Sequence, residues 1–118
     1  MNLEYYKSAD IDRDEFLAAI ERNESLPLRE AMISAVFHID DWKWLQGKYV
    51  ELLGHDDPWV RKVAAICLAH IARIHRRLDV AVVRPLIEAL LEDPETRGHA
   101  EDALEDIEDA IPVDGSAD

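Results

Sequence analysis

Cysteine and histidine are the residues of this chain whose chemistry could support catalysis or hold a metal ion. Cys67 is the single cysteine, and His70 lies one helical turn beyond it. A reactive thiolate needs a polar, accessible site, whereas Cys67 falls on the apolar side of its predicted helix. The five histidines show no metal-ligand spacing such as i, i+4 on one helix, and no glycine-rich phosphate loop occurs; they are His38, His55, His70, His75 and His99. We therefore expect no catalytic site, no metal site and no cofactor.

Acidic residues outnumber basic residues two to one, with 26 Asp and Glu against 13 Lys and Arg, and the net charge is −13. Binding to a nucleic-acid backbone needs clustered Lys and Arg, so we expect no direct nucleic-acid partner. The charge permits attraction to a basic protein, and it equally allows a surface that is only solubilising. No signal peptide and no membrane-length apolar run of about 18 residues is present. These features predict a cytoplasmic protein with no membrane partner.

Helical periodicity is the main structural signal. Four glycines and five prolines are few for this length and favour an all-α fold. Apolar residues recur at helical spacing in segments 12–23, 25–39, 40–53, 58–75, 80–91 and 94–111. Asp12 and Glu15 have the spacing of a capping box, Ser25 is placed to cap the second segment, and Gly54 is placed to end the third. We expect one domain over residues 1–111 and a disordered tail over 112–118.

The fourth and sixth segments repeat one pattern. Asp57-Pro58 is followed 36 residues later by Asp93-Pro94, and at this step Arg61 matches Arg97 and small or aliphatic residues match one another. A step of 32 residues leads from Arg29 to Arg61 and aligns the second segment with the fourth. One helix pair of this size cannot bury its own apolar face, so stacked copies are the expected solution. The repeats are predicted at about 10–39, 40–75 and 79–111.

The stretch from Asp56 to Ala69 resembles the second helix of a HEAT repeat, in which an Asp-Pro turn leads into Val-Arg and then into small and aliphatic residues. The resemblance extends over residues 10–111, although the Asp-Pro turn is absent from the first repeat. It implies a short right-handed α-solenoid of three stacked helix pairs whose second helices line a concave side. Arg29, Arg61 and Arg97 are then expected to form a ladder that ties each repeat to acidic turn residues of its neighbour.

The off-core positions of the second helices are the candidate binding surface. On 58–75 they include Lys62, Ala65, Ile66 and Ala69, with Trp59 as a partly exposed anchor. The repeat steps transfer them to Ile33 and Phe37 on the first repeat. On the third repeat they give an acidic surface made of Glu101, Asp102, Glu105, Asp106 and Asp109. Outward apolar residues beside acidic ones indicate a protein interface, and a merely solvated acidic face is the alternative.

The expected function is a non-catalytic module that binds a basic protein partner through this acidic and apolar face. A concrete version is an immunity protein that neutralises a cationic nuclease toxin, since small size and acidity suit fast association with such a target. A general HEAT-like adaptor that binds a helix or peptide is the first alternative. A HEAT-like enzyme or lyase is a further one, although the repeated His-Glu pairs of the metal-dependent hydroxylases of this class are absent.

Overall fold

A computed structural model of the chain describes residues 9–112. This part consists of six α-helices and a 3-10 helix: α2 (Arg13–Arg22), α3 (Ser25–His38), α4 (Trp42–Leu52), α5 (Pro58–His75), α6 (Val80–Ala89), η1 (Leu90–Glu92) and α7 (Arg97–Ala110). The predicted all-α fold with a short helical repeat is confirmed. Residues 1–8, at the start of the predicted domain, and residues 113–118 of the predicted tail lie outside the described residues.

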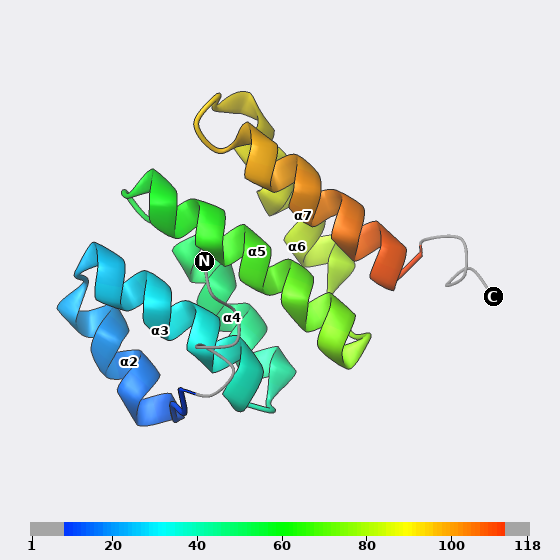
Figure 1. Ribbon diagram of the computed structural model, residues 1–118. Coiled ribbons are helices and arrows are strands. Elements are labelled where there is room, and N and C mark those ends of the chain that lie inside the picture. Colours follow the sequence, from blue (N-terminus) through cyan, green and yellow to red (C-terminus); the bar gives the residue numbers. More distant parts are fainter. Residues whose placement is uncertain (1–8, 113–118) are drawn as a thin grey trace.

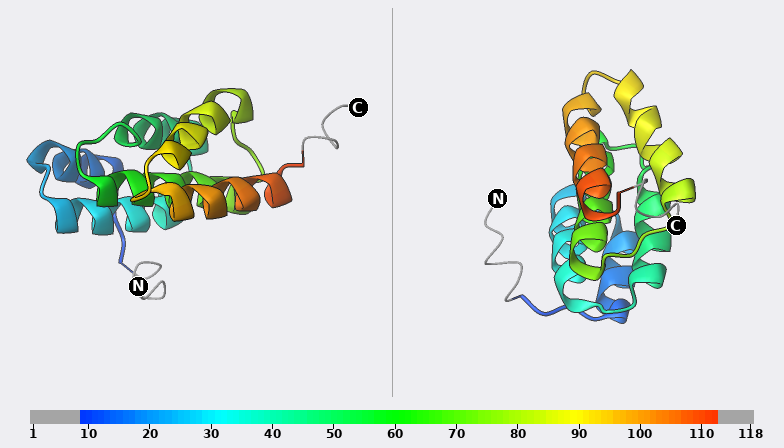
Figure 2. Two further views of the ribbon diagram at one scale, coloured as in Figure 1. Left: turned by 90° about the horizontal axis from the view of Figure 1, so that it is seen from above. Right: turned by 90° about the vertical axis from the view of Figure 1, so that its right-hand side faces the viewer.

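The helices form two layers, with α2, α4 and α6 in one and α3, α5 and α7 in the other (Figures 1 and 2). In the second layer α3, α5 and α7 lie side by side, and α5 contacts both of its neighbours as well as α4. The helices of each layer therefore come from successive pairs, α2 with α3, α4 with α5 and α6 with α7. This is the parallel arrangement of second helices that the repeat pattern predicts.

Several helix starts follow from the local sequence. Asp12 and Glu15 form the expected capping box, in which each side chain accepts a hydrogen bond from the other's backbone N–H. Asp41 caps α4 by accepting from the Trp44 N–H. Asp57 caps α5 by accepting from the Trp59 N–H, and Pro58 occupies the first turn, where its missing N–H costs no helical hydrogen bond.

Two predicted helix starts are wrong. The N-cap of α3 is Glu24 rather than Ser25, because Ser25 is already helical and its hydroxyl donates to the Asp57 carboxylate of the next repeat. Helix α7 begins at Arg97 rather than Pro94, because residues 93–96 form a turn in which the Thr96 hydroxyl donates to the Leu90 carbonyl.

Two predicted helix ends also differ in detail. Helix α6 ends at Ala89 and tightens into η1, so the predicted helix 80–91 is an α-helix followed by a 3-10 turn. Gly54 follows α4 as expected, but it does not adopt the left-handed conformation of many helix ends.

The core runs between the layers and is centred on α5. Its largest fully buried side chains include Phe16, Leu28, Leu45, Leu68 and Ile87, which come from both layers. Helix α5 is buried on three sides, because α4 covers one side and α3 and α7 flank it. Only a narrow strip of α5 is left to solvent, and this strip carries the candidate binding surface.

Candidate protein-binding face

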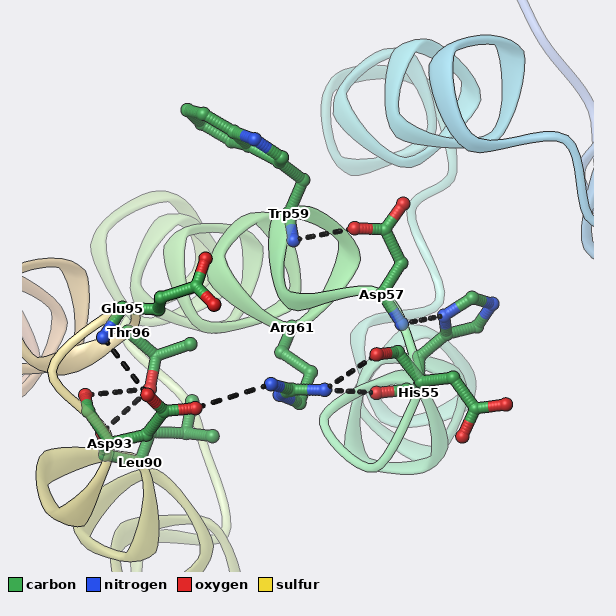
Figure 3. A network of polar contacts seen from close by, with 9 residues as sticks. His55, Asp57, Trp59, Arg61, Leu90, Asp93, Glu95 and Thr96 are labelled. Carbon is green, nitrogen blue, oxygen red and sulfur yellow. Dashed lines mark hydrogen bonds and ion pairs between the residues drawn. The ribbon is translucent and has the colours of Figure 1, made fainter.

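The repeats are joined by polar contacts at the N-terminal ends of the second helices. Arg61 of α5 donates from Nη1 to the carbonyl oxygens of His55, at 2.7 Å, and of Asp56, at 3.0 Å. Its Nη2 lies 3.4 Å from Oδ2 of Asp93, in the turn before α7 (Figure 3). Arg61 thereby joins the second repeat to the third, which confirms this rung of the predicted arginine ladder.

The other two arginines of the ladder behave differently. Arg29 donates to the Ser25 carbonyl of its own repeat, and its charge helps to lower the pKa of Asp57 in the second repeat. The direct hydrogen bond to Asp57 comes from the Ser25 hydroxyl, 2.5 Å from Oδ2. Arg97 donates from Nε to the Leu91 carbonyl at 2.9 Å, within its own repeat. The hydrogen bond from Ser25 is the first cause of the lowered pKa of Asp57, which keeps this carboxyl ionised.

The two Asp-Pro turns make the same local hydrogen bonds. The Trp59 N–H donates to the Asp57 carboxylate and the Arg61 N–H to the Asp57 carbonyl. Thirty-six residues later the Glu95 and Arg97 N–H groups donate to the carboxylate and carbonyl of Asp93 in the same way. The 36-residue step therefore identifies equivalent positions in space as well as in sequence.

The outer face of the second layer carries part of the predicted surface. Lys62 and Ile66 of α5 are half-buried and lie one turn apart. Phe37 is also half-buried, and its ring packs on His70 of α5 at 5.7 Å between centroids. These side chains contact neighbours and still present part of their surface to solvent.

The prediction that Ile33, Ala65 and Ala69 point outward is wrong, because all three are buried, with at most 4% of their surface exposed. The repeat alignment explains the error. The side of α5 that carries Ala65 and Ala69 corresponds to the side of α3 that carries Ile33, and each side packs against the following second helix. The side of α5 that faces solvent is therefore the side that carries Lys62 and Ile66.

The same alignment divides the predicted acidic surface. Glu101, Glu105 and Glu108 are exposed and correspond to Ala65, Ala69 and Ala72, so they occupy the edge of α7 on which a further second helix would pack. Asp102 and Asp106 correspond to Ile66 and His70 and share the outer face. Asp106 lies 3.9 Å from Arg73 of α5, and Asp109 is exposed. Together these residues cover two adjoining sides of α7 with carboxylates, a surface that we call the acidic surface.

Trp59 is an exposed aromatic side chain on this layer, with 48% of its surface accessible, as expected for a partly exposed anchor. The Nζ of Lys62 lies 3.9 Å from its ring centroid, and the guanidinium carbon of Arg29 lies 5.5 Å away. The His99 ring meets its edge at 6.3 Å. The sequence analysis did not place Arg29 and His99 beside Trp59, although Arg29 was already marked by the repeat.

The groups that could support catalysis lie elsewhere. Cys67 is fully buried, and burial raises the pKa of its thiol, as it raises the pKa of the Tyr49 hydroxyl. Tyr49 donates to the Met32 carbonyl at 2.7 Å, and the Cys67 Sγ lies 3.5 Å from the same oxygen. Within residues 9–112, no group of three or more His, Cys, Asp or Glu side chains is arranged to hold a metal ion. None of the described helices is long and apolar enough to cross a membrane.

A pocket of about 540 Å³ lies at the end of the stack, between α6 and the residues that follow α7, and the sequence analysis missed it. Its walls are largely apolar, and Arg84 and Glu88 pair with one another at its rim. The apolar lining comprises Leu78, Val80, Ala81, Pro85, Ile111 and Pro112. Segment 80–91 holds only two charged residues, Arg84 and Glu88, and this was the available signal for an exposed apolar surface.

Comparison with known proteins identifies one feature of the chain. The family model of the HEAT repeat matches residues 46–75, which include most of α4 and all of α5. No curated protein and no solved structure matches the chain. The small all-helical protein therefore contains a HEAT repeat, a unit typical of non-catalytic helical modules that bind other proteins.

Proposed function

We propose that this HEAT-repeat protein is a non-catalytic module that binds a basic protein through the acidic surface of α7 and the adjoining apolar positions of α3 and α5. The proposal includes a specific version, an immunity protein that covers the nucleic-acid site of a cationic nuclease toxin. The net charge of −13 and the protein-binding character of HEAT repeats support a basic protein partner. The predicted contact residues that remain accessible are Phe37, Trp59, Lys62, Ile66, Glu101, Asp102, Glu105, Asp106 and Asp109.

The observation that carries the proposal is the density of carboxylates on the outer surface of α7. In residues 101–109, the exposed acids have a single ion pair among the described residues, which joins Asp106 to Arg73. Like charges one turn apart repel and weaken the helix, and a cationic partner would relieve this repulsion. Charges at the rim of an interface mainly accelerate association and make it sensitive to salt.

The test of this proposal is a triple charge reversal on α7, Glu101→Lys with Glu105→Lys and Asp109→Lys. We expect association with the cognate basic protein to slow by at least about tenfold at low salt and to lose its salt dependence. The matched control reverses three exposed acids of the first layer, Asp14, Glu21 and Glu51. Unchanged affinity in the α7 variant would refute the role of the acidic surface.

The immunity version has its own test. The product of an adjacent upstream reading frame, co-expressed with this chain, should form a complex that suppresses nuclease activity. If that product is not a basic nuclease, or if its activity persists in the complex, the immunity version is wrong while the basic-partner proposal stands.

A general adaptor that binds a helix or peptide is the second candidate, and the half-buried Phe37 and Ile66 favour it. Apolar contacts would then contribute most of the affinity. In that case Phe37→Ala or Ile66→Ala would weaken binding more than the triple charge reversal does.

A further inference from the structure

Trp59 is surrounded by side chains from all three second helices. Arg29 comes from α3, Lys62 from α5 itself and His99 from α7. The indole points away from the helix bundle (Figure 3), and its backbone is fixed by the hydrogen bond from its N–H to Asp57. The position of Trp59 is therefore set by the helix start, and about half of the side chain remains free for contact.

The two cations beside Trp59 make no close ion pair with a carboxylate of the described residues, although the charge of Arg29 helps to lower the pKa of Asp57. Among residues 9–112, neither Lys62 nor Arg29 takes part in an ion pair, although the chain has twice as many acids as bases. The nearby Asp57 is already engaged, because one carboxylate oxygen accepts from Ser25 and the other from the Trp59 N–H. Lys62 and Arg29 instead rest on the indole, where cation–π attraction is modest when solvent reaches the site.

We propose that the cluster of Arg29, Trp59 and Lys62 binds an acidic segment of the protein partner, with an apolar side chain against the indole and a neighbouring carboxylate between the two cations. Tryptophan and arginine are the residues most enriched in the energetic centres of interfaces. A carboxylate can accept hydrogen bonds from both cations, and a guanidinium can bind it through two parallel N–H groups. The proposal rests on the proposed function in that it assumes a protein partner.

This contact is opposite in sign to the one proposed for the acidic surface of α7. A partner that is basic overall would place its cations on α7 and one acidic segment on Trp59. Two contacts of opposite sign on one face fix the orientation of a partner, because the reversed orientation brings like charges together.

The experiment uses the full chain and a blocked peptide, acetyl-Ala-Glu-Leu-Glu-Ala-amide, followed by NMR shifts of the Trp59 indole N–H and the Lys62 side chain. We expect saturable shifts confined to the Trp59 cluster, with affinity at least about tenfold above that of the matching glutamine peptide. Equal binding of the two peptides, or preference for a lysine peptide, would overturn the proposal. So would shifts centred elsewhere on the surface.

Variants separate this inference from the function on which it rests. Lys62→Gln alone, and Lys62→Gln with Arg29→Gln, should abolish the preference for the glutamate peptide, whereas Arg22→Gln with Lys43→Gln on the exposed first layer should not. Persistence of the preference in the double variant would contradict the proposed contact. The peptide measurement does not use the basic partner. Its result therefore tests the Trp59 cluster even if the triple charge reversal on α7 leaves binding of the basic partner unchanged.

Discussion

Arg61 offers the most direct test of how the repeats are held together. Its guanidinium joins the carbonyls of His55 and Asp56, in the turn before α5, to the Asp93 carboxylate before α7. The side chain is 21% exposed, so water replaces the lost partners only in part. Arg61→Ala removes all three contacts and leaves these oxygens without their cationic donor.

The magnitude follows from the individual contacts. Hydrogen bonds from a charged donor contribute about 1.5–3 kcal/mol each when buried, and partial exposure reduces this contribution. The 3.4 Å ion pair with Asp93 adds at most about 1 kcal/mol, because the Asp93 side chain is 44% exposed. We expect Arg61→Ala to lower the free energy of unfolding by about 2–3 kcal/mol, or roughly 10 °C in Tm for a domain of this size.

Urea unfolding followed by circular dichroism measures this loss. Arg61→Lys should recover only part of it, because an ammonium lacks the planar fork that reaches both carbonyls and Asp93. A double-mutant cycle with Asp93→Asn isolates the contact between repeats, and we expect a coupling of about 0.5–1 kcal/mol. Full stability of Arg61→Ala, or a coupling of zero in the cycle, would refute the role assigned to this arginine.

Three further predictions concern the core, the cap of α5 and the edge of the stack. Tyr49→Phe should cost about 1 kcal/mol, and since the pKa of Tyr49 is raised by burial, the wild type should lose stability above about pH 10 more steeply than the variant in thermal melts. The pKa of Asp57 is lowered in the folded protein, so ionised Asp57 adds to the free energy of unfolding above its unfolded pKa, and this stabilisation is lost as the pH falls from the unfolded pKa through the folded pKa. Ser25→Ala should therefore make the free energy of unfolding fall less steeply with acid in urea titrations at about pH 2–5. Replacing the edge glutamates Glu101, Glu105 and Glu108 together by alanine should make the chain self-associate in sedimentation velocity, because this side of α7 would then resemble the side of α5 that packs on the next repeat. A triple variant that stays monomeric would contradict this.

Much of the fold could be predicted from the sequence because its signals are local. The capping box at Asp12, the Asp57-Pro58 start of α5 and the apolar periodicity each depend on residues within a few turns. The 36-residue step between the Asp-Pro turns correctly predicted equivalent helices that lie side by side. The same local reasoning failed at Ser25, since its hydroxyl is used by Asp57 of the next repeat and not by its own helix.

The candidate surface was predicted less well, for a geometric reason. A single helix reveals which side is apolar, but a helix in a stack is covered from below and from both flanks, and small residues such as Ala65 and Ala69 can serve either as flank or as surface. The composition could not distinguish these two uses, so Ile33 was placed outward although it is buried.

The sequence by itself determined the helical class, the repeat and the strong negative charge, because each is a property of residue types and their spacing along one chain. Only the tertiary structure decided which side of each second helix faces water and which faces the next repeat. It also brought Arg29, Trp59 and His99 together from three helices. Contacts between residues some thirty to seventy positions apart depend on how whole helices pack, and no local pattern encodes that packing.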